Sequence, residues 1–143
     1  MKTHTLSLIA LALLACSPAT TAAIAAEKGS QPATISQGAK IKIAEHLVPG
    51  KITIFDFTSK YCPPCVRIAP MLDKLHARHD EIAVVKVDIN RPNTKGIDWD
   101  SPVARQQGLR SIPHFMIYGP DGKLKAEGEK ARDIVMKWLK DLK

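Results

Sequence analysis

The sequence predicts an α/β fold with three layers, in which a central mixed β-sheet is flanked by helices. Two apolar runs rich in β-branched residues, 51–57 and 82–89, are typical of buried strands. Between them, apolar residues recur with helical spacing over residues 63–79. Two further strands, 115–118 and 124–127, are joined by a Gly-Pro-Asp-Gly turn and are therefore predicted to form an antiparallel hairpin. Helices between central strands imply the three layers and the mixed sheet.

The remaining elements are shorter or lie at the end of the chain. Residues 41–47 are predicted to form a short helix or strand. Ser101 and Pro102 suit the N-cap and the first residue of another short helix, which follows a long loop. Residues 131–142 carry apolar residues at helical spacing and are predicted to form the last helix.

Composition and charge narrow the classes of protein to which the chain can belong. Of its 143 residues, 45% are hydrophobic and 24% are charged, which excludes collagen-like, coiled-coil and wholly disordered chains. The formal net charge is +7, but the cations do not gather into a basic run, so no nucleic-acid partner is expected. With 3 cysteines, the chain is neither a small disulfide-knotted protein nor a four-thiolate zinc protein.

The first 26 residues have the pattern of an export signal. Lys2 provides the positive start, and residues 6–15 form a short apolar stretch. Ala23-Ile24-Ala25 then has the A-x-A form that signal peptidase accepts. The apolar stretch is shorter than the ~18–20 residues that a permanent membrane-spanning helix needs. We therefore predict a signal peptide over residues 1–26.

The same leader contains a second cleavage pattern. Leu13-Leu14-Ala15-Cys16 resembles the bacterial lipobox, in which the cysteine is lipid-modified and becomes the new N-terminus. Two outcomes stay open: a lipoprotein anchored through Cys16, or a periplasmic or secreted protein that has lost the whole leader. Contact with a membrane is expected only in the first case. In either case residues 27–40 are expected to be a flexible N-terminal arm, and residues 41–143 one folded domain.

The clearest chemistry lies at Cys62 and Cys65, which two prolines separate. A helix is predicted to begin between them, and the free N–H groups and dipole at a helix start favour a negative charge. Cys62, as the outermost thiol, is therefore expected to have a lowered pKa, and Cys65 to be the buried resolving thiol. Pro63 and Pro64 suit the first turn, whose N–H groups have no partner within the helix.

Other uses of a Cys-x-x-Cys pair fit this chain less well. A c-type haem site needs His after the second cysteine, where this chain has Val66. A structural zinc site needs four ligands, and only two thiolates are close in sequence. A purely structural disulfide would close a loop too short to contribute much stability. The spacing therefore predicts a redox-active pair.

Residues 56–73, which read DFTSKYCPPCVRIAPMLD, resemble the active-site segment of the thioredoxin family. The resemblance continues through residues 85–88, the tripeptide Ser111-Ile112-Pro113 and residues 121–123. It covers most of residues 50–143. It implies a thioredoxin-like sandwich and a thiol–disulfide oxidoreductase.

The resemblance also implies roles for single residues. Asp56 matches the family's buried acid behind the disulfide, which can exchange a proton with the resolving thiol, and Lys86 matches the lysine that approaches it. Pro113 matches the cis-proline that faces the disulfide and leaves the backbone at Ile112 free to pair with a substrate strand. Gly128 matches a glycine that lets substrate approach closely.

Several positions depart from the family pattern. Tyr61 stands where Trp is usual before the first cysteine, and Pro63 and Pro64 replace the usual Gly-Pro. We expect these residues to contact substrate, so the departures leave the substrate and the redox potential open. His114 follows Pro113, where thioredoxins commonly have Thr.

These observations lead to three hypotheses. The favoured one is an exported, monomeric thiol–disulfide oxidoreductase without a cofactor. It would reduce protein disulfides, with oxidation and isomerisation as less favoured directions, and would be recharged by a membrane-embedded thiol donor. The second is a carrier of copper or another soft metal that uses Cys62, Cys65 and His114, because two thiolates and an imidazole suit Cu(I). The third is a redox-inert domain that binds a partner protein.

Overall fold

The computed structural model describes residues 31–142, so the predicted leader and Cys16 lie outside the described residues. The strands are β1 (Ala33–Ile35), β2 (Ile52–Thr58), β3 (Ile82–Asp88), β4 (His114–Tyr118) and β5 (Leu124–Glu127). The helices are η1, a 3-10 turn (Ile43–His46), α1 (Pro63–Arg78), α2 (Pro102–Gln106) and α3 (Gly128–Asp141). Among these residues, no helix is long and apolar enough to cross a membrane.

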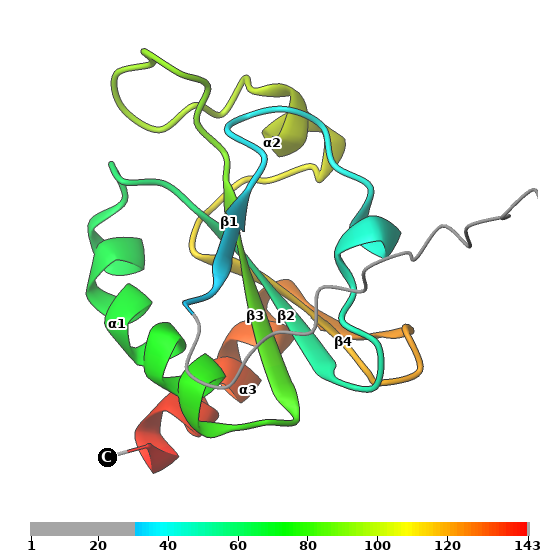
Figure 1. Cartoon of the computed structure of the whole chain (residues 1–143). Coiled ribbons are helices and arrows are strands. Elements are labelled where there is room, and N and C mark those ends of the chain that lie inside the picture. The colour runs from blue at the N-terminus through cyan, green and yellow to red at the C-terminus, as the bar shows by residue number, and fades with distance from the viewer. Residues whose placement is uncertain (1–30, 143) are drawn as a thin grey trace, which may run out of the picture.

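The five strands form one mixed sheet in the order β1-β3-β2-β4-β5 (Figure 1). β1, β3 and β2 are parallel to one another. β4 is antiparallel to β2, and β5 is antiparallel to β4. The crossover from β2 to the parallel strand β3 runs through α1, as a parallel connection requires. The predicted mixed sheet and the predicted hairpin are therefore confirmed.

Two apolar cores on opposite faces of the sheet make the three layers. Because side chains alternate along a strand, Ile54 of β2 packs towards α1 and α3, whereas its neighbours Phe55 and Phe57 pack towards α2. Asp56 shares the face of Ile54, so a carboxyl group lies under the start of α1. The predicted three-layer α/β sandwich is confirmed, and the alternation places an acid inside one core.

The N-terminal segment differs from the flexible arm predicted over residues 27–40. Ala33–Ile35 is an edge strand whose residues pair with β3, for example Ala33 with Val85. Beyond the strand, the Gly38 N–H donates to the Asp88 carbonyl at 2.9 Å, and the Gly38 carbonyl accepts the Val103 N–H at 3.1 Å. The arm prediction is wrong for these residues, because a strand of three residues carries too little pattern to be found without its partner.

Two helix starts show how local sequence and backbone conformation set the boundaries. The predicted cap of α2 is confirmed, since the Ser101 hydroxyl accepts the Ala104 N–H at 3.2 Å. The last helix begins at Gly128, ahead of the predicted start at residue 131. Gly128 has a φ of 62°, a left-handed conformation that favours glycine. The sharp change of direction between β5 and α3 therefore takes place at this residue.

The long connection between β3 and α2 is held by a buried acid. The Asp98 carboxylate accepts hydrogen bonds from the Arg91 side chain at 2.7 and 3.0 Å, from the Arg91 N–H at 3.2 Å and from the Thr94 hydroxyl at 3.3 Å. The Asp98 side chain is 3% exposed and that of Arg91 is 51% exposed. Hydrogen bonding from Arg91 lowers the pKa of Asp98 to about 2.

We expect Asp98→Asn to lower the free energy of unfolding by about 1–3 kcal/mol at pH 7, because Arg91 and Thr94 lose the charged acceptor that this buried side chain provides. The folded pKa is below the ordinary value of 3.8, so this contribution is present above pH 3.8 and is lost as the pH falls towards 2. Urea unfolding at pH 7 measures the effect. Asp100→Asn is the matched control, because Asp100 forms an exposed pair with Arg105 that should contribute less than about 1 kcal/mol. Equal losses in both variants would contradict a special role for Asp98.

Candidate active site

Cys62 and Cys65 are joined by a disulfide at the start of α1, with the sulfur atoms 2.07 Å apart and the Cα atoms 5.3 Å apart. Cys62 is the N-cap of the helix, and its Sγ accepts the Cys65 N–H at 3.2 Å. Pro63 and Pro64 are the first helical residues, where a missing N–H costs no helical hydrogen bond. On reduction, the free N–H groups and the dipole of the helix start would favour the thiolate form of Cys62.

Exposure does not distinguish the two cysteines. Cys62 is 2% exposed and Cys65 is 1% exposed, so the prediction that Cys65 is buried is confirmed, whereas the prediction that Cys62 is the more exposed of the two is wrong for the oxidised protein. The reason is a segment distant in sequence: the Ile112 carbonyl oxygen lies 3.7 Å from the Cys62 Sγ. What does distinguish the cysteines is their neighbours, because Cys65 instead lines a cavity with Asp56.

The segment before β4 lies directly beside the disulfide. The peptide bond between Ile112 and Pro113 is cis, as predicted. Ser111 is exposed and Ile112 is half-buried, so solvent reaches this segment next to Cys62. Pro113 has no N–H to offer a neighbouring strand. A peptide that approaches the disulfide would therefore meet the backbone at Ile112.

Asp56 is a buried carboxyl group on β2 behind the cysteine pair. It is 1% exposed, and its Oδ1 has no hydrogen-bond partner. Burial raises the pKa of Asp56 from 3.8 to about 7, while the charge of Lys86 lowers this pKa and that of Asp73 raises it. Near neutral pH both protonation states are therefore populated, as a group that takes and returns a proton requires.

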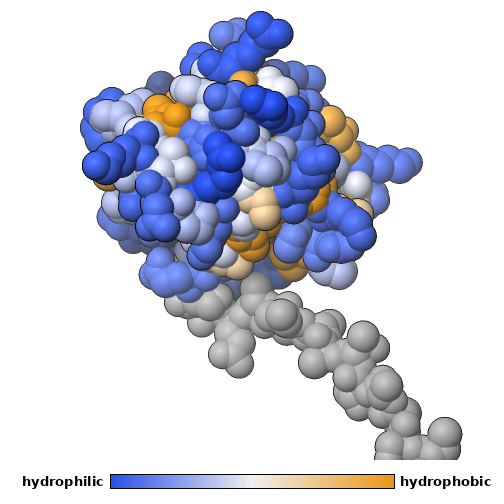
Figure 2. Space-filling view, turned by 90° about the horizontal axis from the view of Figure 1, so that it is seen from above, coloured by the Kyte–Doolittle hydropathy of each residue, from blue (hydrophilic) through white to orange (hydrophobic). Residues whose placement is uncertain are grey.

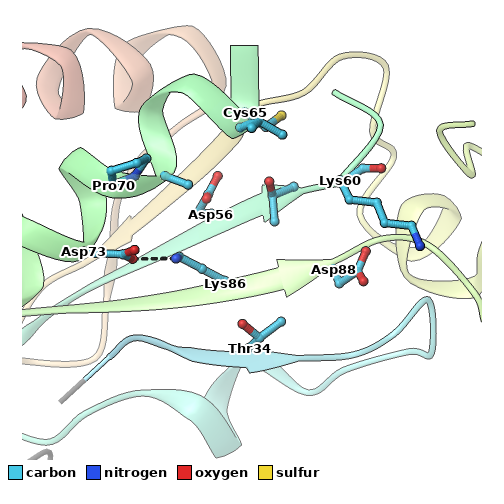
Figure 3. Close-up of a pocket in the computed structure, with 12 residues that line it drawn as sticks. Thr34, Asp56, Lys60, Cys65, Pro70, Asp73, Lys86 and Asp88 are labelled. Atoms are coloured by element: carbon cyan, nitrogen blue, oxygen red, sulfur yellow. Dashed lines mark hydrogen bonds and ion pairs between the residues drawn. The ribbon is translucent and has the colours of Figure 1, made fainter. Parts of the chain in front are cut away.

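Lys86 lies beside Asp56 but forms its ion pair elsewhere. The two residues are register partners on β2 and β3. The Lys86 Nζ nevertheless donates to the Asp73 Oδ1 on α1 at 2.5 Å, as the dashed line in Figure 3 shows. Lys86 therefore lies next to Asp56 as predicted, but its ion pair is with Asp73 and not with Asp56. Asp73 was not identified from the sequence as a site residue. Its position could have been inferred, because residues 65, 69 and 73 are four apart and therefore lie on one face of the helix.

A cavity of about 300 Å³ connects these groups (Figure 3). Asp56 and Cys65 lie in its middle part, with the Lys86–Asp73 pair to one side and the charged side chains of Lys60 and Asp88 to the other. β1 closes one side through Thr34. The remaining lining residues are uncharged: Thr58, Ser59, Val66, Ala69 and Pro70. Asp56 is therefore buried but not sealed, because the cavity offers a path for a proton.

Tyr61 and Gly128 show how far the structure bears on the predicted substrate contacts. Tyr61 is 37% exposed, and the Lys60 ammonium lies 5.1 Å from the centre of its ring. Pro63 and Pro64 are also exposed. A Cβ added at Gly128 would lie 3.7 Å from the His114 ring, an ordinary contact distance. The backbone conformation accounts for this glycine, and its role in substrate approach stays a prediction.

His114 does not combine with the cysteines into a metal site. Its ring packs edge-on against Phe57, with centroids 5.8 Å apart, and its Nε2 lies 3.5 Å from the Glu127 Oε1. Across residues 31–142, no group of three His, Cys, Asp or Glu side chains is placed to hold a metal ion. The copper-carrier hypothesis therefore finds no support in this geometry.

Comparison with known proteins decides the family. The family model for thioredoxin matches residues 41–141. The chain belongs to the thioredoxin family. Thioredoxin H-type of Brassica campestris is 31% identical over 102 residues, which are 71% of this chain and 75% of that protein. Thioredoxin 1 of Synechococcus elongatus is 36% identical over 80 residues, 55% of this chain and 64% of that protein.

Solved structures of thioredoxins share the fold. A thioredoxin mutant from Halobacterium salinarum has a TM-score of 0.55 at 20% identity, over 82% of this chain and 94% of that one. A thioredoxin f2 in complex with ferredoxin:thioredoxin reductase has a TM-score of 0.51 at 26% identity, over 75% of this chain and 91% of that one. Family membership and the Cys62–Cys65 disulfide together make this thioredoxin-family protein a thiol–disulfide oxidoreductase.

Proposed function

We propose that this thioredoxin-family enzyme works as an exported reductase of protein disulfides. The observation that carries the proposal is the buried Asp56 carboxyl, whose Oδ1 has no hydrogen-bond partner, in the same cavity as Cys65. A base beside the resolving thiol supports the proton transfer that the release of a reduced target requires. The helix start favours the Cys62 thiolate that begins the reaction.

The reaction proceeds by two exchanges of disulfide bonds. The Cys62 thiolate attacks one sulfur of a target disulfide, forms a mixed disulfide and releases the other target sulfur, which takes up a proton. The Asp56 carboxylate then takes the proton of the Cys65 thiol. The Cys65 thiolate attacks the Cys62 Sγ, and the bond between Cys62 and the target breaks. The second target sulfur leaves as a thiolate and takes a proton from solvent, so the target has two thiols and the enzyme keeps the two oxidised sulfurs as the Cys62–Cys65 disulfide.

Substrates would bind in extended form beside Ile112 and Pro113, because this backbone segment lies next to Cys62. Tyr61, Pro63 and Pro64, which are exposed next to the two cysteines in the chain, would also contact the substrate. The face seen in Figure 2 is mainly hydrophilic, with hydrophobic residues in separate small spots. That face offers no broad apolar surface for a second copy, which fits a monomer that meets its substrates transiently.

Two measurements test the proposed direction. The reduction potential of the Cys62–Cys65 pair should lie closer to the ~-270 mV of thioredoxin than to the ~-120 mV of a strong periplasmic oxidant. The reduced protein should also catalyse the reduction of insulin disulfides. A potential near the oxidant value together with no insulin reduction would reject the reductase and leave an oxidant in its place.

Export and recharging are the other parts of the proposal. The pattern of residues 1–26, which lie outside the described residues, supports export. An exported reductase needs electrons from the cytoplasm, which a membrane-embedded thiol donor would supply by the same exchange chemistry. One solved thioredoxin f2 is bound to ferredoxin:thioredoxin reductase. For this chain, the membrane-embedded donor would be the reductase partner that reduces the Cys62–Cys65 disulfide.

We expect the full chain, expressed in a bacterial host, to be recovered from the periplasmic fraction with its leader removed. If the lipobox is used, the protein instead fractionates with membranes, because acyl chains contribute about 0.8 kcal/mol for each buried CH₂. Cys16→Ser is the matched control, since it removes lipidation and leaves Ala23-Ile24-Ala25 intact. Recovery of the uncleaved chain in the cytoplasm would contradict export in either form.

A further inference from the structure

The Lys86–Asp73 ion pair occupies the cavity wall where Lys86 would otherwise be free to neutralise Asp56. Lys86 and Asp56 are register partners on adjacent strands, so the ammonium lies within range of the buried carboxyl group. Its hydrogen bond nevertheless goes to the Asp73 Oδ1 at 2.5 Å. The Asp56 Oδ1 is left without any partner.

We propose that Asp73 is a positioning residue for the resolving step: by binding Lys86 it keeps the ammonium off Asp56, which stays free to exchange a proton with Cys65. The inference rests on the proposed role of Asp56. Asp73 reaches the site from α1, the same helix that carries Cys65, and all four residues line one cavity (Figure 3). If Lys86 were bound directly to Asp56, the carboxylate would be stabilised as an ion and would be a weak base.

The electrostatics agree with this geometry. Burial is the largest cause of the raised pKa of Asp56, the nearby charge of Lys86 lowers that pKa, and the charge of Asp73 raises it. Asp73 therefore raises the pKa of Asp56 in two ways. It places a negative charge nearby, and it holds the Lys86 ammonium away from the Asp56 carboxyl group. Both effects keep the carboxyl group protonated up to neutral pH, where it can also return a proton when the disulfide is reduced.

Other charged groups lie around the same cavity and can affect how the titration of Asp56 depends on pH. β3 also contributes Asp88, and the loop between β2 and α1 contributes Lys60. On α1, burial is the main cause of the lowered pKa of His76; the charges of Lys51 and Lys86 lower this pKa further, and that of Asp73 raises it. β4 places the apolar Phe115 opposite Asp56. Lys86 and Asp73 are the charges that influence the pKa of Asp56 directly.

The resolving step conserves protons and bonds. The Asp56 carboxylate and the Cys65 thiol become the Asp56 carboxylic acid and the Cys65 thiolate. The thiolate then forms the bond to Cys62 Sγ and the target thiolate leaves, taking a proton from water. When the disulfide is later reduced, the Asp56 acid returns its proton to the Cys65 thiolate. Asp73 and Lys86 exchange no proton with either group.

Carbon-13 NMR titration of the Asp56 carboxyl group in the oxidised protein tests the proposal without any substrate. We expect Asp73→Asn to lower its titration midpoint by about one pH unit or more, because the freed ammonium would pair with Asp56. Lys86→Met should move the midpoint upwards. In the Lys86→Met background, Asp73→Asn should have a clearly smaller effect, which a double-mutant cycle measures. Asp73→Glu, which keeps the charge, should restore a midpoint close to that of the wild type.

The matched control is Asp121→Asn, which removes the carboxylate of the exposed Asp121–Lys125 pair at 2.8 Å and should leave the midpoint unchanged. An unchanged midpoint in Asp73→Asn would overturn the proposal. A shift of equal size with and without Lys86 would also overturn it, because Asp73 would then act directly and not by holding the ammonium. The titration needs no substrate. If the midpoint of Asp56 shifts as expected but the protein reduces no insulin, the result speaks against the proposed function and leaves the role of Asp73 standing.

Discussion

Replacing Cys62 by serine should abolish turnover of disulfide substrates, because no thiolate remains to begin the exchange. Cys65→Ser should behave differently and accumulate mixed disulfides between Cys62 and its targets, since the resolving thiol is absent. The assignment rests on neighbours, because the two cysteines are almost equally buried. Cys62 lies against the Ile112 carbonyl, where a substrate would bind, and Cys65 shares a cavity with Asp56.

Non-reducing gel electrophoresis followed by mass spectrometry identifies the trapped adducts. The mixed disulfides form only from the reduced protein, and free thiols could exchange with them after lysis. All thiols should therefore be alkylated at the moment of lysis. The double variant, with both cysteines replaced by serine, is the control and should form no adducts. Adducts that appear in Cys62→Ser and not in Cys65→Ser would reverse the two roles.

Asp56→Asn should slow the resolving step by about 100-fold near pH 7, because an amide cannot take the proton of Cys65. The wild-type rate should rise with pH through about 7, where the carboxyl group ionises, since its pKa is raised to about 7 by burial. The variant should lose this rise. Single-turnover measurement of target release from the mixed disulfide gives both results. A variant with wild-type rates from pH 6 to 8 would reduce Asp56 to a structural residue.

The same substitution should make the oxidised protein more stable in alkali. The pKa of Asp56 is about 7 in the fold against 3.8 ordinarily, so the folded state binds the proton more tightly than the unfolded chain. The stability linked to that proton is present below pH 3.8 and is lost as the pH rises through 7. At about 1.4 kcal/mol for each pH unit, the ionised carboxylate destabilises the fold by about 4 kcal/mol.

Urea unfolding at two pH values isolates this effect. At pH 8.5 Asp56→Asn should gain up to about 4 kcal/mol over the wild type, reduced by any hydrogen bonds that the buried amide cannot make. Near pH 3 the gain should vanish, because the carboxyl group is then protonated in both states. A gain that is the same at both pH values would show that the substitution acts through packing and not through ionisation.

Much of the molecule follows from local sequence. The buried strands, the hairpin, α1 and the capped start of α2 depend on apolar spacing and on turn and cap residues that lie next to one another in the chain. The redox pair is equally local, because two residues between the cysteines let one helix start hold both. The family resemblance added the positions of Asp56 and Pro113, which spacing alone does not assign.

The sequence by itself therefore determined the three-layer fold and the cysteine pair, and its resemblance to a known family located the carboxyl group behind them. Only the tertiary structure decided that Ala33–Ile35 joins the sheet, that Ile112 covers the Cys62 sulfur, and that Lys86 pairs with Asp73 and not with its strand neighbour. In each of these cases the partner comes from a segment distant in the chain. Local propensity describes how a segment folds, whereas the choice among partners depends on which segments the packed sheet and helices bring within a few ångströms.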